Sequence, residues 1–80
     1  MDKEYKTLIN KALERFHFRL SASGTHAERA AQESLTRAIK SIYDTAFYID
    51  DPDALDELSI LVCAAENGHH IEPYNLESIA

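Results

Sequence analysis

Disulfide-forming cysteines and long apolar runs are both missing from this chain of 80 residues. Its one cysteine, Cys63, excludes an intrachain disulfide and a cysteine-based zinc site. No apolar run approaches the roughly 18 residues of a membrane span. The N-terminal stretch MDKEYK also lacks the apolar segment of a signal peptide. We therefore expect a cytoplasmic protein without a membrane span.

Glycine and proline are scarce as well, with two of each. Because these residues interrupt helices and form turns, their scarcity favours a few long helices. The hydrophobic fraction of 45% and the charged fraction of 28% are ordinary for a globular protein. A chain of this length makes one small domain, residues 1–80, which buries only about 60–65% of its unfolded surface. Its core must be efficient or be completed by a second chain.

The second half of the chain contains no lysine or arginine. Residues 1–40 hold all eight basic residues and five acidic ones, a balance of +3. Residues 41–80 hold nine acidic residues and no basic one, a balance of −9. Such asymmetry bears on partners and association rather than on the fold.

Two helices are predicted from apolar residues that recur at spacings of three and four. The first covers residues 2–20, and the stretch SASG then forms a turn. Thr25 and Glu28 match a capping box, so the second helix is predicted over residues 26–48. The predicted buried positions are Tyr5, Leu8, Ile9, Ala12, Leu13, Phe16 and Leu20 in the first helix, and Ala27, Ala31, Leu35, Ala38, Ile39, Ile42, Tyr43, Ala46 and Phe47 in the second.

The third helix is predicted over residues 52–67. Proline is favoured at the first helical position, so Asp51 before Pro52 is the predicted N-cap, and Gly68 is the residue after the C-cap. Cys63 is predicted to be buried beside the core. The core stripe consists of Ala54, Leu55, Leu58, Leu61, Val62 and Ala65.

The predicted fold is an all-α three-helix bundle with a C-terminal tail or a short fourth helix. The third helix is apolar nearly all round between residues 58 and 65, so another segment must cover its back. The tail, residues 68–80, offers Ile71, Tyr74, Leu76 and Ile79 for that purpose, and Glu72-Pro73 is a possible start of a fourth helix.

Metal binding and catalysis find no support in the motifs. A calcium loop that starts at Asp51 has neither the glycine at position 6 nor the glutamate at position 12. His69 and His70 are adjacent, whereas zinc ligands on a helix are spaced by four residues. The chain has no nucleophile elbow, phosphate loop or dinucleotide fingerprint. We expect no metal, no cofactor and no enzymatic activity.

The stretch YIDDPDALDE concentrates five carboxylates in ten residues. Helix capping needs only some of them, and like charges this close repel. We interpret the surplus as a surface for a basic protein partner. The predicted partner-binding residues are Asp44, Asp50, Asp51, Asp53, Asp56 and Glu57, together with Phe18, an aromatic residue on the charged side of the first helix.

A non-enzymatic regulator or inhibitor of a nucleic-acid-handling protein is therefore the expected function. It would occupy the phosphate-binding surface of that protein, as small phage-type inhibitors of restriction or CRISPR complexes do as a class, which is an analogy from size and charge rather than a sequence match. Two alternatives stay open. Lys11, Arg15 and Arg19 form a basic stripe that could bind nucleic acid directly, or the basic half could bind the acidic half of a second copy, as in a homodimer.

Overall fold

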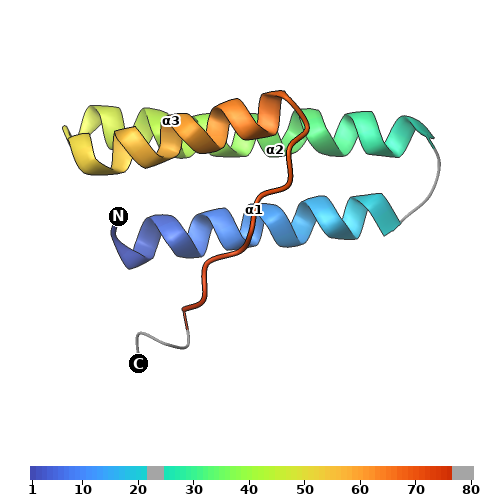
Figure 1. Ribbon diagram of the computed structural model, residues 1–80, viewed down its shortest axis with the longest axis horizontal. Coiled ribbons are helices and arrows are strands. Elements are labelled where there is room, and N and C mark those ends of the chain that lie inside the picture. Colours follow the sequence, from blue (N-terminus) through green and yellow to red (C-terminus); the bar gives the residue numbers. More distant parts are fainter. Residues whose placement is uncertain (22–24, 77–80) are drawn as a thin grey trace.

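A computed structural model describes residues 1–21 and 25–76, with Thr25 and His26 described by their backbone alone. Helix α1 spans Lys3–Ser21, α2 spans Thr25–Tyr48 and α3 spans Pro52–Glu66 (Figure 1). The described part of the chain contains no strand. The predicted all-α class is confirmed, and each predicted helix end lies within one residue of the observed one. The Thr25–Glu28 capping box falls on a side chain outside the described part.

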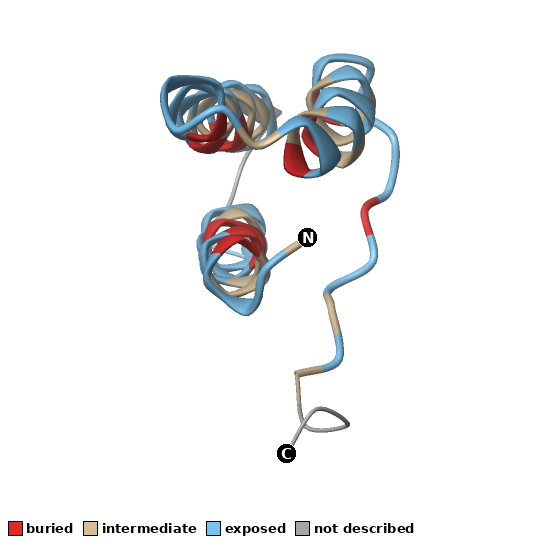
Figure 2. Ribbon diagram, turned by 90° about the vertical axis from the view of Figure 1, so that its left-hand side faces the viewer, coloured by how far each residue is buried: buried red, intermediate tan, exposed pale blue. Residues whose placement is uncertain are grey.

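Helix α2 holds the fold together, because it packs on both α1 and α3. Seen end-on, α1 lies under α2, α3 lies beside α2, and the tail runs down past α3 toward the level of α1 (Figure 2). The buried residues lie on the sides of the three helices that face one another (Figure 2). The core cluster consists of Tyr5, Ile9, Ala12, Leu13, Leu35, Ile39, Ile42, Ala46, Ala54, Leu58, Ala65 and Ile71.

Four apolar side chains that were predicted to be buried are exposed. Leu8 is 49% exposed, Leu20 37% and Phe47 66%, and Cys63 is exposed on α3. The reason is geometric. Each outer helix packs extensively only on α2, so the arc that it buries is narrower than its apolar stripe. Phe47 instead lies in the last turn of α2, next to the turn that leads to α3. The apolar back of α3 is covered on one side only, and Ile60 there remains 69% exposed.

Both ends of α3 form as predicted. The Oδ1 atom of Asp51 accepts a hydrogen bond from the backbone N–H of Ala54 at 3.2 Å, and Pro52 is the first helical residue. After the C-cap residue Asn67, Gly68 has a φ of 69°. That left-handed conformation favours glycine, so the predicted role of Gly68 is confirmed.

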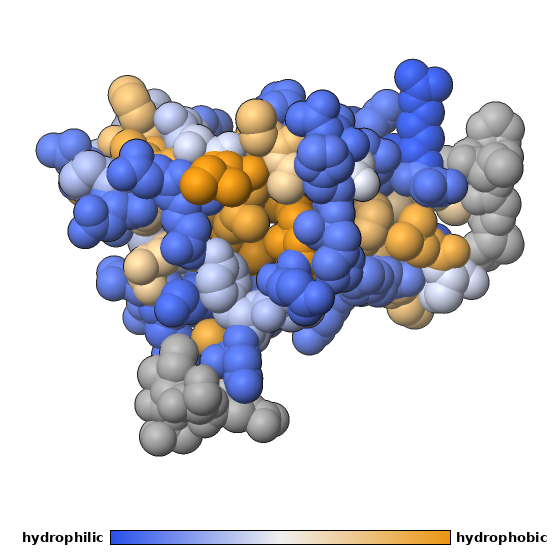
Figure 3. Space-filling view, viewed as in Figure 1, coloured by the Kyte–Doolittle hydropathy of each residue, from blue (hydrophilic) through white to orange (hydrophobic). Residues whose placement is uncertain are grey.

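The tail after α3 is extended rather than helical over residues 69–76, so no fourth helix begins at Glu72-Pro73. It crosses from the end of α3 to α1 (Figure 1). Ile71 is 6% exposed and belongs to the core, whereas Tyr74 and Leu76 are half-buried. The predicted cover residue Ile79 lies outside the described residues. Apolar side chains gather in the middle of the face that the tail crosses, with hydrophilic ones around them (Figure 3).

Asn10 of α1 fixes the tail. Its side-chain N–H donates to the backbone oxygen of Tyr74 at 2.8 Å, and its Oδ1 accepts from the Tyr74 backbone N–H, also at 2.8 Å. The amide thereby satisfies both backbone polar groups of one tail residue. Lys6 adds its ammonium group 5.6 Å from the centre of the Tyr74 ring.

Replacing Asn10 tests this clamp. Asn10→Ala leaves the half-buried backbone groups of Tyr74 without their partner, so we expect a loss of about 1–3 kcal/mol in the free energy of unfolding. Urea denaturation followed by circular dichroism measures it. The control is Thr7→Ala, which removes a hydrogen bond that stays within α1 and should change stability by less than about 0.5 kcal/mol. Equal effects of the two changes would show that the Asn10 clamp contributes no stability.

Candidate functional site

The predicted acidic residues gather at one end of the molecule. Asp44 lies in the last two turns of α2, Asp50 and Asp51 form the turn, and the other three lie in the first two turns of α3. We call this surface the acidic end. Four of its carboxylates, Asp44, Asp50, Asp53 and Asp56, belong to exposed residues and take part in none of the ion pairs of the described residues. Lys40, the last basic residue of the chain, pairs with Glu66 at 3.3 Å instead.

Asp50 occupies an unusual backbone position. It is the only non-glycine residue of the described part with a positive φ, 58°. The backbone N–H of Asp50 donates a hydrogen bond to the backbone oxygen of Phe47 at 3.2 Å. The backbone N–H of Asp51 donates to the backbone oxygen of Ala46 at 3.1 Å. This is a Schellman motif that ends α2, and its left-handed position is most often glycine.

The end of α3 has the same motif with glycine. There Gly68 donates to the oxygen of Ala65 at 3.2 Å and His69 to that of Ala64 at 2.8 Å. One chain therefore ends one helix with the favoured residue and another with an aspartate. Aspartate tolerates the left-handed region better than most residues but still less well than glycine. Asp50 was predicted as a binding residue, and its backbone conformation was not.

Three consecutive apolar residues are exposed beside Asp50. Phe47 is 66% exposed, Tyr48 88% and Ile49 64%. A helix that buries one face cannot bury three consecutive residues equally. The run of three apolar residues therefore already indicated that part of this stretch is exposed, which we did not predict. Exposed aromatic and aliphatic side chains therefore lie next to carboxylates that form no ion pair among the described residues.

Two members of the acidic end have partners inside the molecule. Asp51 caps α3 and also faces Tyr5 of α1, whose hydroxyl is buried without a hydrogen-bond partner. Burial, followed by the charge of Asp51, raises the pKa of Tyr5 above its ordinary value. Glu57 is half-buried and accepts a hydrogen bond from the hydroxyl of Tyr74. Burial and this bond raise the pKa of Tyr74 strongly.

Phe18 is exposed, as the binding prediction requires, but it does not join the acidic end. It is 75% exposed, because α1 continues past it to Ser21 and buries the opposite face, which holds Ile9. It lies near the C-terminal end of α1, beside the start of α2, whereas the acidic end lies at the opposite end of the molecule (Figure 1). The predicted site residues therefore form one surface and one separate aromatic residue.

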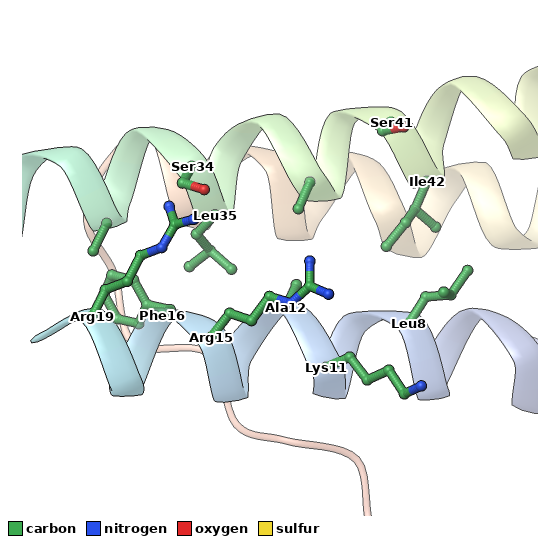
Figure 4. Close-up of a pocket in the computed structure, with 12 residues that line it drawn as sticks. Leu8, Lys11, Ala12, Arg15, Phe16, Arg19, Ser34, Leu35, Ser41 and Ile42 are labelled. Atoms are coloured by element: carbon green, nitrogen blue, oxygen red, sulfur yellow. The ribbon is translucent and has the colours of Figure 1, made fainter.

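The basic stripe of α1 borders a groove between α1 and α2. The groove has a volume of about 290 Å³ and is lined by Leu8, Lys11, Ala12, Arg15, Phe16, Arg19, Ala31, Ser34, Leu35, Ala38, Ser41 and Ile42. Arg15 and Arg19 reach from α1 toward α2, whereas the Lys11 side chain extends along α1 (Figure 4). Sequence reasoning found the three cations but not the groove, because that depends on how α1 packs on α2.

Metal-ligating residues do not converge in the described part of the chain, where no three His, Cys, Asp or Glu side chains lie close enough to hold an ion. His70 instead contacts Glu72 of the tail at 3.1 Å. Within the same residues, no helix is long and apolar enough to cross a membrane.

Alkaline pH tests the contacts of the two tyrosines. A raised pKa means that folding favours the neutral phenol, so both tyrosines contribute stability below the ordinary pKa of 10.0. That contribution is lost as the pH rises through the folded-state pKa. We expect the urea midpoint to fall above pH 10, and to fall less steeply in Tyr5→Phe and Tyr74→Phe. Tyr48→Phe, which changes a residue that is 88% exposed, is the control. Identical pH profiles for all four proteins would contradict the assignment.

Comparison with known proteins places the chain in a family without naming an activity. No curated protein and no solved structure matches the chain. A family model matches residues 1–80, which is the full length of the sequence. The chain therefore belongs to the family described as a domain of unknown function, DUF4754.

Proposed function

We propose that this protein is a non-enzymatic interaction module, a small helical bundle closed by its tail, that docks its acidic end on a basic surface of a protein partner. Proteins that bind nucleic acids carry such surfaces, because they neutralise phosphates with lysine and arginine. The specific form of the proposal is a regulator or inhibitor that occupies the phosphate-binding surface of a nucleic-acid-handling protein in the cytoplasm.

The backbone of Asp50 is the observation that carries the proposal. A glycine at this position would relieve the cost of the left-handed conformation, and the same chain uses glycine in the matching motif at Gly68. Strain that is retained at one position is a pointer to function. The carboxylate of Asp50 is exposed between the apolar residues that end α2 and the carboxylates that begin α3.

The neighbours of Asp50 give the surface the two components that a binding site needs. Phe47, Tyr48 and Ile49 offer apolar area that becomes buried on contact, which is where binding energy concentrates. Asp44, Asp53 and Asp56 offer unpaired negative charge, which mainly speeds association and excludes wrong partners. Glu57 contributes less than expected from the sequence, because Tyr74 already donates to its carboxylate.

Direct binding of nucleic acid is the second candidate. The groove beside Lys11, Arg15 and Arg19 favours it, because no carboxylate neutralises these cations in the described part of the chain. The net charge of −6 opposes it, since a duplex would repel the remainder of the molecule.

Asp50→Gly separates stability from binding. Glycine suits the left-handed position, so the free energy of unfolding should rise by a few tenths to about 1 kcal/mol. Binding to the partner should weaken, mainly through slower association, because one exposed carboxylate is lost. The partner is first captured from a host lysate at low salt and identified by mass spectrometry. Association rates with the purified partner are then compared for the wild-type protein and the variant.

Glu72→Gln is the matched control, because it removes an exposed carboxylate from the tail rather than from the acidic end. It should leave the association rate unchanged. If Asp50→Gly associates as fast as the wild-type protein, the acidic end is only a solvated helix start and the search moves to Phe18 and Ile60.

A further inference from the structure

The groove between α1 and α2 carries three cations on one edge. Lys11, Arg15 and Arg19 follow one another at spacings of four residues, so they form a line about 12 Å long. All three are exposed, and none forms an ion pair in residues 1–21 and 25–76. Both arginines reach over the groove rather than away from it (Figure 4). A ligand in this groove therefore meets positive charge along one side.

The floor of the same groove is apolar. Ala12, Leu35 and Ile42 are buried beneath it, and Phe16 and Ala38 are half-buried along it. Leu8 lies at one end of the groove and is 49% exposed. A nucleic-acid backbone would satisfy the cations but would not fill this floor. The groove suits an amphipathic helix that presents carboxylates beside an apolar side chain.

Helix α3 presents such a stripe on its outward side. Asp53, Asp56 and Ile60 are all exposed and are spaced by three and four residues, which places them on one face over about 10 Å. The two carboxylates have no cationic partner within the chain's described ion pairs. Ile60 is 69% exposed. We call these three residues the α3 stripe.

We propose that the groove between α1 and α2 binds the α3 stripe of a second copy of this chain. The carboxylates of Asp53 and Asp56 would lie along Lys11, Arg15 and Arg19, and Ile60 would enter the apolar floor. Both surfaces have nearly equal lengths and opposite charges. The α1–α2 pair would then be flanked by helices on both sides, with its own α3 on one side and the partner's α3 on the other.

The contact joins two different surfaces, so each copy keeps one unused groove or one unused α3 stripe unless two copies bind each other reciprocally. Each copy also has a net charge of −6, which opposes association over distance while the local contact is attractive. Salt weakens both the repulsion between the net charges and the attraction at the contact, so added salt can either strengthen or weaken self-association. The decisive test is therefore charge reversal with complementation rather than salt titration.

Two single variants each disrupt one of the two surfaces of the proposed contact. Arg15→Glu damages the groove and leaves the α3 stripe intact, whereas Asp56→Arg damages the stripe and leaves the groove intact. Both residues are exposed, so both variants should fold, which circular dichroism checks. In sedimentation equilibrium, the mass of the wild-type protein should rise with concentration. Each variant alone should remain monomeric over the same range, and an equimolar mixture of the two should form a heterodimer.

Arg37→Glu on α2 and Glu72→Arg on the tail are the controls, because they reverse exposed charges outside the groove and the stripe. Both should associate like the wild-type protein. The proposal is wrong if the wild-type protein is monomeric throughout, if the controls lose association as fully as Arg15→Glu, or if the mixture forms no heterodimer. A wild-type monomer that binds a short DNA duplex through Arg15 would replace it with nucleic-acid binding.

The inference shares Asp53 and Asp56 with the proposed function, yet the two can fail separately. Arg15→Glu keeps the acidic end unchanged, so its association rate with a foreign basic protein measures the proposed function without self-association. Loss of the heterodimer with normal binding of the foreign partner would overturn only the inference. The reverse result would overturn only the proposed function.

Discussion

The pairing of Asn10 with the backbone of Tyr74 fixes the course of the tail, the part of this molecule that helix packing does not determine. Helix α2 packs on both other helices, so α1 and α3 are joined mainly through it. The tail provides the second connection. It leaves α3 at Gly68, buries Ile71 in the core and is held at Tyr74 by Asn10 of α1. A chain of 80 residues has a small core, and this segment adds Ile71 to it.

The same closure shapes the two surfaces on which the functional proposals depend. With the tail across one face, the groove between α1 and α2 remains open on the other (Figure 4). Tyr74 of the tail also holds Glu57, and Asp51 is occupied by the cap of α3. Two of the six predicted acidic residues therefore make hydrogen bonds within the molecule. The other four remain at the acidic end with free carboxylates beside exposed apolar residues.

The sequence was sufficient for the elements and insufficient for their mutual arrangement. Helix ends could be predicted because local chemistry determines them, as at Asp51, Pro52 and Gly68. Exposure could not, because periodicity shows which face is apolar but not how much of it a neighbour covers. Leu8, Phe47 and Cys63 were misassigned for this reason. The route of the tail was also beyond prediction, since Asn10 and Tyr74 are 64 residues apart.

In the candidate site too, the sequence predicted local features, and only the structure showed how they are arranged. Asp50 was predicted from local charge density, but its left-handed backbone only became visible with the Schellman motif. Phe18 was predicted from its place on the helix and is exposed, yet it lies at the wrong end of the molecule to join the acidic end. Charge patterns along a sequence therefore found the surfaces, while the fold decided which residues share one.

The most direct test of the central proposal is an NMR map of the surface that the captured partner covers. Amide signals of the ¹⁵N-labelled protein are followed as the unlabelled partner is added. The proposal predicts that the shifted signals cluster between residues 44 and 60, and that those of Asn10 and Glu72, which belong to neither the acidic end nor the groove, stay in place. Shifts confined to α1 and the facing side of α2, with the signals around Asp50 unchanged, would contradict it.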